Sequence, residues 1–404
     1  MTHTIAATAD VRRANASRVF GHLLDTGPAS RTEIREATGL VSGTVGAIVH
    51  DLIARGLVVE EGDTVPTAGR PRRILAVASG RVLGARARIH PTDLEVDLID
   101  LAGRRLWGRT VGHHAATEGP HGLVAALCQG LQEAQDRAGR IDGAWFAGSI
   151  VITLGPVARE STVVVSLDLP LAGLDLRTAI QQRLSPSHDV RVVNDGRLGA
   201  LAEYWSLPAG VRSHTMAYIN SGFSGVSGGV VQDGAVLGGG HGLAGEVGHI
   251  VVDKNGPRCT CGARGCLTTF LRTSVMLAKA GVVLDEADTR GSRPLDRLAG
   301  LLEQVDPAAL AAVAAGAEAL EAAVATLSNL ADVDLVVLGG HLPRLRPWLH
   351  GAIDNLIARR AAVSPVFNPV VRDARFAADA EMRGAWLMMR SRVVADPLAV
   401  PLLD

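Results

Sequence analysis

Three helical segments and a strand account for the pattern of apolar side chains over the first sixty residues. Apolar residues recur every three or four positions in each helical segment, as on the buried face of an amphipathic helix. Ser30 and Glu33 match a capping box at the start of the second segment. Residues that favour helix ends separate the segments, namely Gly27, Pro28, Gly39, Ser42 and Gly56. The strand that follows Gly56 begins a predicted hairpin.

This order of elements is typical of a winged helix-turn-helix. In such a fold the third helix lies in the major groove of DNA, and its N-terminal residues face the base edges. We expect those residues to be Ser42, Gly43 and Thr44. The predicted hairpin tip has the sequence AGRPRR, and its arginines suit DNA phosphates or a narrow minor groove: Arg70, Arg72 and Arg73.

The distribution of charge favours a nucleic-acid partner for this segment. Residues 10–81 contain ten arginines, no lysine and eight acidic side chains, so ten minus eight leaves a charge of about +2, whereas the whole chain has a net charge of −1. The alternative is a helical protein-interaction module with a solvated basic loop.

From residue 82 the pattern changes to alternating strands interrupted by longer helices. The first block predicts strands at 82–88, 94–100, 104–111, 144–152 and 190–193, with helices at 121–138 and 196–206. A second block repeats this order, with strands near 215–220, 226–232, 235–238 and 333–338. Two such units in tandem predict an α/β protein with two lobes and a cleft, of actin-like or hexokinase-like architecture.

We therefore expect three domains. They are a winged helix-turn-helix at 1–80, a first lobe at 81–195 and a second lobe at 196–404, with the C-terminal helix a candidate to return to the first lobe. The composition is that of a soluble globular protein, because 47% of the 404 residues are hydrophobic and 20% are charged. No uninterrupted apolar run approaches the ~20 residues of a membrane helix, and the first ten residues lack a secretory signal. We expect a cytoplasmic protein without membrane insertion.

Soft metal ligands cluster in the stretch HIVVDKNGPRCTCGARGC, which begins at His249. It contains three of the four cysteines of the chain, and with the histidine they form a Cys3His set: His249, Cys259, Cys261 and Cys266. Four such ligands complete the tetrahedron that zinc prefers and leave no position for water or substrate. The sequence therefore predicts a structural zinc ion. The alternative is three buried thiols, or one disulfide and a spare thiol.

Four motifs resemble those of the ROK family, named for repressor, open reading frame and kinase. They are NDGRLGALAEYW at 194–205, GLAGEVGHI at 242–250, the CTCGARGC loop, and LVVLGGHLP at 335–343. The resemblance covers nearly the whole chain. The family joins sugar kinases and sugar-responsive repressors, and its repressors carry an N-terminal winged helix-turn-helix that ends in a GRP wing.

The resemblance implies a sugar site. In the family's kinases the aspartate that matches Asp195 deprotonates a sugar hydroxyl, and the residues that match Asn194, Glu246 and His249 bind the sugar. Such groups suit a polyol because a buried carboxylate accepts hydrogen bonds from vicinal hydroxyls. An alternative role for Asn194 and Asp195 is to cap the helix that follows them.

The chain departs from the family's kinases where phosphates would bind. Those kinases begin the first lobe with a DxGGT loop, whereas this chain has GARARIH at 84–90, with Arg86 in place of the aspartate. The change removes a magnesium-associated carboxylate and adds bulk where backbone amides would approach phosphates, so we expect no phosphoryl transfer. The glycine-rich stretch at 222–229 is expected to form a hairpin turn. Thr268 stands where family members commonly have a glutamate that touches the sugar.

These expectations combine into a transcriptional regulator, most often a repressor in this family. It would bind double-stranded operator DNA as a homodimer or homotetramer, respond to a sugar or sugar derivative, and control genes of carbohydrate uptake or metabolism. Two alternatives stay open: an ATP-dependent sugar kinase with an added DNA-binding head, and a ligand-independent DNA-binding regulator. Arg86 favours the regulator over the kinase.

Overall fold

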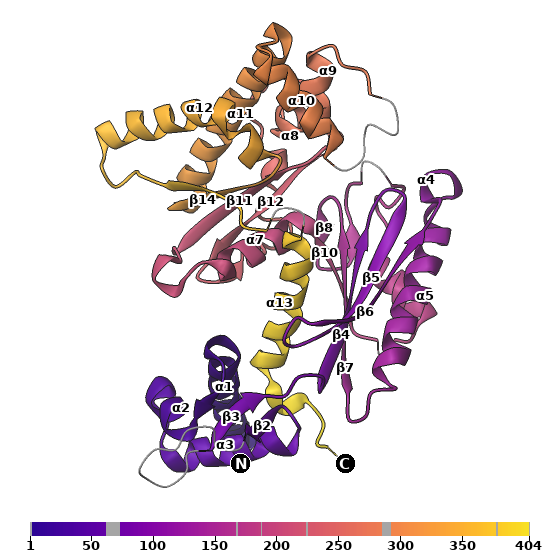
Figure 1. Ribbon diagram of the computed structural model, residues 1–404, viewed down its shortest axis with the longest axis vertical. Coiled ribbons are helices and arrows are strands. Elements are labelled where there is room, and N and C mark those ends of the chain that lie inside the picture. The colour runs from indigo at the N-terminus through magenta and orange to yellow at the C-terminus, as the bar shows by residue number, and fades with distance from the viewer. Residues whose placement is uncertain are drawn as a thin grey trace.

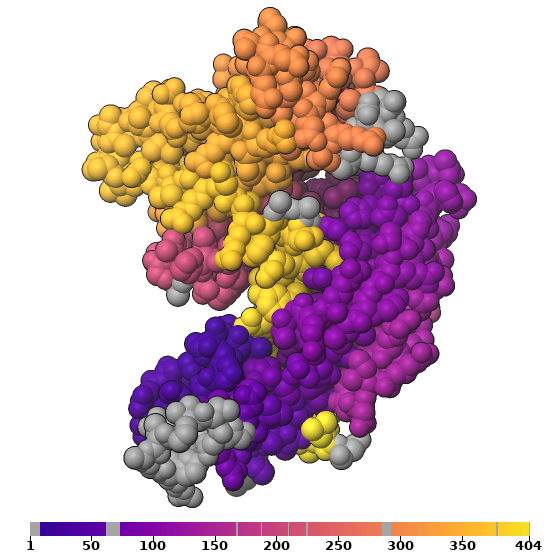
Figure 2. Space-filling view, viewed as in Figure 1, coloured from indigo at the N-terminus to yellow at the C-terminus, as the bar shows by residue number. Residues whose placement is uncertain are grey.

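The computed structural model of the chain describes residues 2–61, 73–166, 169–186, 188–223, 225–284, 292–376 and 379–403. Figure 1 shows a small N-terminal head, two larger lobes, and a long C-terminal helix that runs between them. In the space-filling view the surface between the head and the second lobe is hollowed, and the C-terminal helix lies at the back of this hollow (Figure 2).

The head, residues 2–61 and 73–77, packs three helices and a small sheet around one apolar core. The helices are α1 (Thr2–Thr26), α2 (Arg31–Thr38) and α3 (Ser42–Ala54). The strands pair in the order β1-β3-β2, with bounds Ala29–Ser30 for β1, Ile74–Val77 for β3 and Val58–Glu61 for β2. The predicted apolar stripes form the core, because Phe20, Ile34, Val49 and Leu52 are all buried.

The boundaries of α2 confirm the local prediction. The Ser30 hydroxyl accepts the Glu33 amide N–H at 3.3 Å, and the Ser30 amide donates to the Glu33 carboxylate at 2.7 Å. Gly39 ends α2 with φ of 67°, a left-handed conformation that residues with a Cβ rarely adopt. The next helix, α3, then leaves at an angle of 116° to α2.

The first lobe is built on a five-stranded sheet in the order β10-β7-β4-β5-β6. Its antiparallel part is β4 (Val82–Ile89), β5 (Asp93–Asp100) and β6 (Arg105–Gly112); β7 (Trp145–Thr153) and β10 (Val190–Asn194) add parallel strands. Three helices accompany this sheet: α4 (Ala115–Glu118), α5 (Pro120–Ala138) and α6 (Leu176–Arg183). A small hairpin, β8 (Val157–Ala158) and β9 (Thr162–Val163), follows β7.

The second lobe repeats this arrangement, as the tandem pattern predicted. Its sheet has the order β13-β12-β11-β14-β15, again with three antiparallel strands followed by two parallel ones. The strands are β11 (Thr215–Ser221), β12 (Val226–Gln232), β13 (Ala235–Val236), β14 (Leu335–Gly340) and β15 (Val370–Asp373). The helices are α7 (Asp195–Ser206), α8 (Thr268–Leu271), α9 (Thr273–Lys279), α10 (Arg293–Glu303), α11 (Pro307–Ala331) and α12 (Leu342–Val363), with short 3-10 turns η1 (Ala209–Val211) and η2 (Val247–His249).

Helix α11 is long and apolar enough to cross a membrane by length and composition, with a mean hydropathy of 1.6. Its apolar sequence is interrupted by Glu318 and Glu321, so it contains no continuous apolar run of membrane-spanning length. In the fold α11 packs against α8, α9 and α12, and its buried face includes Val313, Leu320 and Val324. These contacts are those of a core helix of the second lobe.

The last helix, α13 (Ala380–Ala395), leaves the second lobe and packs along α7 and against β4 and β7 of the first lobe. Its far end reaches α1 of the head (Figure 1). A final turn, η4 (Pro397–Ala399), and the residues to 403 then lie against α1 and α3. The domain boundaries at 80 and 195 stay a prediction.

Candidate functional site

A cavity of about 160 Å³ lies where the two lobes meet, and it is lined by all four side chains predicted to bind sugar. Asn194 and Asp195 come from the junction of β10 and α7, Glu246 precedes η2, and His249 ends it. The first lobe adds an apolar side made of Leu154, Pro156 and Val165, and the second lobe adds Asn220, Phe223, Val226, Ser227, Thr260 and Thr268. Residues more than fifty positions apart therefore share one small space.

Asn194 caps a helix and lines the cavity at once. Its side-chain oxygen accepts the Arg197 amide N–H at 3.2 Å, which makes it the N-cap of α7. Its amide nitrogen donates to the Gly155 carbonyl at 2.9 Å and to the Asp195 carboxylate at 3.0 Å. The capping role considered for this residue is thus present, and the same bonds hold Asp195 in place.

Asp195 is half-buried and lines the cavity. The Ser227 hydroxyl donates to its carboxylate at 2.9 Å. Burial, and secondly the charge of Glu381, raise the pKa of Asp195 to about 6. The carboxylate is therefore mostly ionised at neutral pH, and it also accepts hydrogen bonds from the backbone amides at the start of α7.

Glu246 offers a free acceptor to the cavity. Its Oε1 atom is buried and has no hydrogen-bond partner among the described residues. Burial, and secondly the charge of Asp195, raise the pKa of Glu246 to about 7. A buried acceptor without a donor is costly, so this atom favours a ligand that brings an N–H or O–H group.

Four further polar residues line the cavity without having entered the set of predicted sugar ligands: Asn220, Ser227, Thr260 and Thr268. Asn220 and Ser227 face each other across β11 and β12, and the Asn220 amide nitrogen donates to Ser227 Oγ at 3.3 Å. Thr268 was noted only as a departure from the family pattern, yet it lines the cavity and its hydroxyl accepts the Val226 amide N–H at 3.2 Å. The glycine stretch forms the predicted turn, in which the Gly222 amide donates to the Gly225 carbonyl at 2.9 Å.

The four predicted metal ligands converge beside the cavity. Their ligand atoms all lie within 4.8 Å of one another. The Sγ atoms of Cys261 and Cys266 are 3.6 Å apart, and Cys259 Sγ is 3.6 Å from Nδ1 of His249. A tetrahedral zinc ion, with bonds of about 2.3 Å to sulfur and about 2.0 Å to nitrogen, places neighbouring ligand atoms about 3.5 to 3.8 Å apart. The donor set and its spacing fit zinc.

The loop that carries these cysteines depends on glycine at its closest contact. Gly265 has φ of 66°, and a Cβ atom at this position would lie 1.6 Å from the carbonyl oxygen of Asp253. His249 contributes its Nδ1 to the cysteine cluster while its ring lines the cavity. The cysteine and histidine cluster therefore adjoins one wall of the cavity.

In the head, the predicted DNA-facing residues lie at the exposed start of α3. Ser42 and Gly43 are exposed, Thr44 is half-buried, and Val41 at the N-cap is 72% exposed. Arg73 makes an ion pair of 2.6 Å with Glu60 and stays largely exposed. The other two wing arginines, Arg70 and Arg72, lie outside the described residues.

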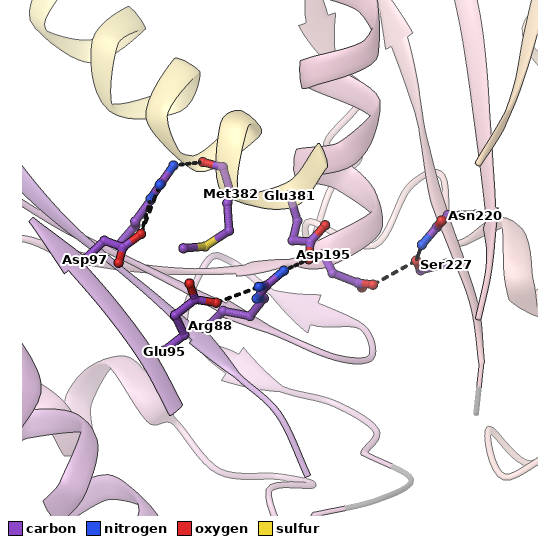
Figure 3. Close-up of polar contacts among 9 residues, drawn as sticks. Arg88, Glu95, Asp97, Asp195, Asn220, Ser227, Glu381 and Met382 are labelled. Atoms are coloured by element: carbon purple, nitrogen blue, oxygen red, sulfur yellow. Dashed lines mark hydrogen bonds and ion pairs between the residues drawn. The ribbon is translucent and has the colours of Figure 1, made fainter. Parts of the chain in front are cut away.

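Strand β4 carries two arginines whose partners were not evident from the sequence. Arg86 donates to Asp97 at 3.0 Å and to the carbonyl of Met382 at 2.8 Å. Arg88 pairs with Glu95 on β5 and with Glu381 on α13, both at 2.6 Å. Figure 3 shows these pairs next to Asp195 and Ser227. The end of β4 near the cavity is therefore occupied by ion pairs.

A sequence model of the ROK family matches residues 88–392. The xylose repressor of Caldicellulosiruptor bescii is 25% identical over 407 residues, which cover 97% of this chain and 98% of that protein. The DNA-binding transcriptional dual regulator NagC of Escherichia coli is 26% identical over 382 residues, covering 90% of this chain and 89% of NagC.

Two solved structures show the same fold. A ROK family transcriptional regulator, described as a homologue of E. coli Mlc, has a TM-score of 0.75 at 24% identity and covers 96% of this chain and 98% of its own. A ROK family glucokinase from Streptomyces griseus, solved with glucose and AMPPNP, has a TM-score of 0.57 at 22% identity. The match covers 98% of the glucokinase but only 76% of this chain.

Proposed function

This chain belongs to the ROK family, and from that premise we propose that it is a transcriptional repressor that binds operator DNA and responds to a sugar. The observation that carries the proposal is the length of the match. The repressor of C. bescii aligns with 97% of this chain, whereas a complete glucokinase aligns with only 76%. The chain thus has residues beyond the kinase fold, and the alignment with the repressor covers nearly all of the chain.

The head supports the DNA-binding part of the proposal as a winged helix-turn-helix. Its helices α2 and α3 meet at 116°, within the range of about 90 to 120° found for DNA-binding helix pairs. The start of α3 is exposed, and Ser42, Gly43 and Thr44 face solvent there in whole or in part. We propose that these residues enter the major groove and that Arg70, Arg72 and Arg73 of the wing contact the backbone or minor groove.

The cavity supports a carbohydrate as effector. Its volume of about 160 Å³ is close to the about 150 Å³ of an engineered cavity that holds benzene, so one six-membered ring fits. One side is apolar and the other offers Asn194, Asp195, Glu246 and His249. This combination of an apolar wall and hydroxyl acceptors matches the two faces of a sugar ring.

The ion pairs of β4 support regulation rather than phosphoryl transfer. A kinase holds ATP phosphates with magnesium and closely placed backbone amides. Here Arg86 and Arg88 occupy that strand end, and their charges are matched by acidic partners. We therefore propose that the chain is not a kinase.

We propose that zinc is held by His249, Cys259, Cys261 and Cys266 and serves only to shape the cavity wall. We also propose that the repressor works in the cytoplasm as a symmetric homo-oligomer.

The test is selection of genomic fragments by the purified chain, followed by titration of a retained fragment with sugars. D-xylose and N-acetyl-D-glucosamine are the first probes, followed by the sugars handled by enzymes encoded beside the fragment. A regulatory response corresponds to about a 5- to 150-fold change in DNA affinity. We expect Asp195→Ala to remove the response to sugar, while the variant still binds the selected fragment without ligand.

Three results would count against parts of this proposal. Retention of no fragment above non-specific background contradicts a DNA-binding repressor. Retention that no sugar alters favours the ligand-independent regulator instead. A response that persists in Asp195→Ala places the effector elsewhere.

A further inference from the structure

Helix α13 contacts all three parts of the molecule. It packs on α7, which begins with the cavity residue Asp195, on β4 and β7 of the first lobe, and on α1 of the head. The helices of the head meet the rest of the described chain chiefly through α13 and the η4 turn after it. At 16 residues, α13 is about 24 Å long and spans the distance from the cavity to the head.

The upper end of α13 is tied to the cavity by charge. Glu381, in its first turn, pairs with Arg88 at 2.6 Å, and Arg86 donates to the carbonyl of Met382 at 2.8 Å. Glu381 also raises the pKa of Asp195, so the two carboxylates are close enough to repel each other. Figure 3 shows Glu381 beside Asp195, above the guanidinium of Arg88.

The middle of α13 is interlocked with its neighbours. A Cβ atom on Gly384 would lie 1.9 Å from the carbonyl oxygen of Leu198, so α13 and α7 touch backbone to backbone. On the opposite side Met389 fills the space above Gly84 of β4, where a Cβ atom would lie 1.9 Å from its sulfur. A helix held this closely moves as a unit, because packed interfaces have discrete arrangements and do not deform continuously.

The C-terminal end of α13 contacts the head. Arg390 forms an ion pair with Asp25 of α1, and Val394 packs against Gly21. Beyond η4, Arg55 at the end of α3 donates to the carbonyl of Val400 at 2.7 Å. The Leu403 amide donates to the carbonyl of Ala54 at 2.9 Å. The tail, residues 396–403, therefore holds the C-terminal end of α3.

We propose that α13 and the tail carry the state of the cavity to the head, and that the Arg88–Glu381 ion pair is the contact through which the cavity acts on the helix. This inference rests on the proposed function, which places an effector at one end and operator DNA at the other. Asp195 is mostly ionised at neutral pH, so hydroxyl groups that donate to its carboxylate offset part of the negative charge and weaken the repulsion of Glu381. The first turn of α13 then shifts relative to Arg88, and the head follows because Arg390 and the tail hold α1 and α3.

The test is amide hydrogen exchange of the full chain with substitutions at both ends of this route. Asp195→Asn removes the cavity charge without changing the shape of the side chain. We expect it to change exchange rates in the second half of α1 and in the tail by at least about threefold. In a Glu381→Gln background the same substitution should have no effect there, because the two residues act in series. Asp296→Asn, which breaks an ion pair with Arg344 on the far lobe, is the matched control and should leave α1 and the tail unchanged.

Two outcomes would overturn the inference. In the first, Asp195→Asn changes hydrogen exchange only around the cavity. In the second, Asp195→Asn changes exchange in α1 equally in the parent and in the Glu381→Gln background. If Glu381→Gln does not fold, Arg390→Ala cuts the route at its lower end. The effect of Asp195→Asn should then persist in α13 and be lost in α1.

DNA retention with D-xylose and N-acetyl-D-glucosamine, measured on the same proteins, separates the two proposals. If neither DNA nor sugar binds, the proposed function fails and hydrogen exchange alone decides whether α13 transmits a signal. If DNA binding responds to sugar equally in the parent, Glu381→Gln and Arg390→Ala, the repressor assignment stands and the route through α13 is wrong.

Discussion

At the scale of single residues, the cavity is defined by carboxylates that the fold keeps away from water. Asp195 receives one hydrogen bond from Ser227 and one from Asn194, while Glu246 has a buried oxygen without a donor. Both groups hold their protons to higher pH than they would in water, with pKa values of about 6 and about 7. The free protein stores unfavourable free energy at this site, which a ligand with several hydroxyls relieves.

The raised pKa of Asp195 predicts how stability depends on pH. Between the unfolded value of 3.8 and the folded value of about 6, the folded state binds more protons than the unfolded state. The free energy of unfolding therefore falls as pH rises through this window and levels off above it. From pH 5 to pH 7.5 we expect the parent to lose about 1 kcal/mol more than Asp195→Asn, which has no carboxyl to titrate. Urea denaturation at both pH values measures this difference, and parallel losses in the two proteins would contradict the buried state of Asp195.

The cysteine cluster predicts one zinc ion per chain. Cys261→Ser removes one of four ligands and should release the ion and lower the sugar affinity, because His249 belongs to both the cluster and the cavity wall. Cys128→Ser is the control, since Cys128 lies buried on α5, outside the metal loop, and should leave zinc in place. Elemental analysis of both proteins is the measurement. Parent protein prepared without chelators and free of metal would end the zinc assignment.

At the scale of elements, α3 carries glycines that its own packing does not explain. Gly43 and Gly46 lie inside the helix, and a Cβ atom at either position would meet nothing within 4 Å. Glycine costs a helix interior about 1 kcal/mol relative to alanine. The buried residues of α3, including Val45 and Val49, lie on its other face. An external surface that approaches the helix backbone, such as a DNA groove, accounts for this arrangement.

Gly46→Ala should therefore stabilise the free protein and weaken DNA binding. The matched control is Gly351→Ala in α12, where the added Cβ atom also meets nothing within 4 Å. Both substitutions should raise the free energy of unfolding by up to about 1 kcal/mol. Only Gly46→Ala should reduce affinity for the selected fragment. If both variants bind DNA like the parent, α3 does not approach DNA closely at this position.

The wing arginines should act through phosphate contacts. Replacing Arg70 and Arg72 by alanine should lower affinity for all DNA sequences and reduce the slope of log affinity against log salt by roughly two. Arg359→Ala, at an exposed arginine of α12 in the second lobe, is the control; it removes one positive charge where the wing variant removes two, and it should leave the slope unchanged. Filter binding at several salt concentrations gives the slopes. An unchanged slope in the double variant would exclude the wing from the interface.

At the scale of the whole molecule, two lobes with repeated topology enclose the cavity, and the head packs against α13 and the tail. The S. griseus glucokinase, solved with glucose and AMPPNP, has the same fold, so the fold alone does not separate a kinase from a regulator. We propose that the side chains at the end of β4 and the presence of the head make the distinction.

We therefore expect no sugar-dependent turnover of magnesium-ATP. Arg86 and Arg88 place paired cations and bulk where a kinase needs a carboxylate for magnesium and open backbone amides. A coupled assay with D-xylose, N-acetyl-D-glucosamine and D-glucose is the measurement, with the S. griseus type of glucokinase as positive control. Turnover near the about 1 to 100 per second of typical kinases would overturn the regulator proposal.

The sequence by itself determined the features that depend on neighbouring residues. Three local features are of this kind: the capping box of Ser30 and Glu33, the helix end at Gly39, and the turn at Gly222. In each of them the interacting residues are only a few positions apart in the sequence. The cysteine loop is local as well, because its four ligands span only residues 249–266. The repeated order of strands predicted both sheets except for β15 (Val370–Asp373), the edge strand of the second sheet.

Only the tertiary structure decided which distant residues meet. Asn220 and Ser227 enter the cavity because β11 and β12 pair in one particular register, and strand patterns leave that register open. Arg88 meets Glu381 across 293 positions, and Arg390 meets Asp25 across 365. The hydrophobic periodicity of the sequence does not predict such contacts, because each contact depends on how whole helices and strands pack. The residues of the site could thus be found in short sequence motifs, whereas the contacts between the site and the head depend on the path of α13 through the folded molecule.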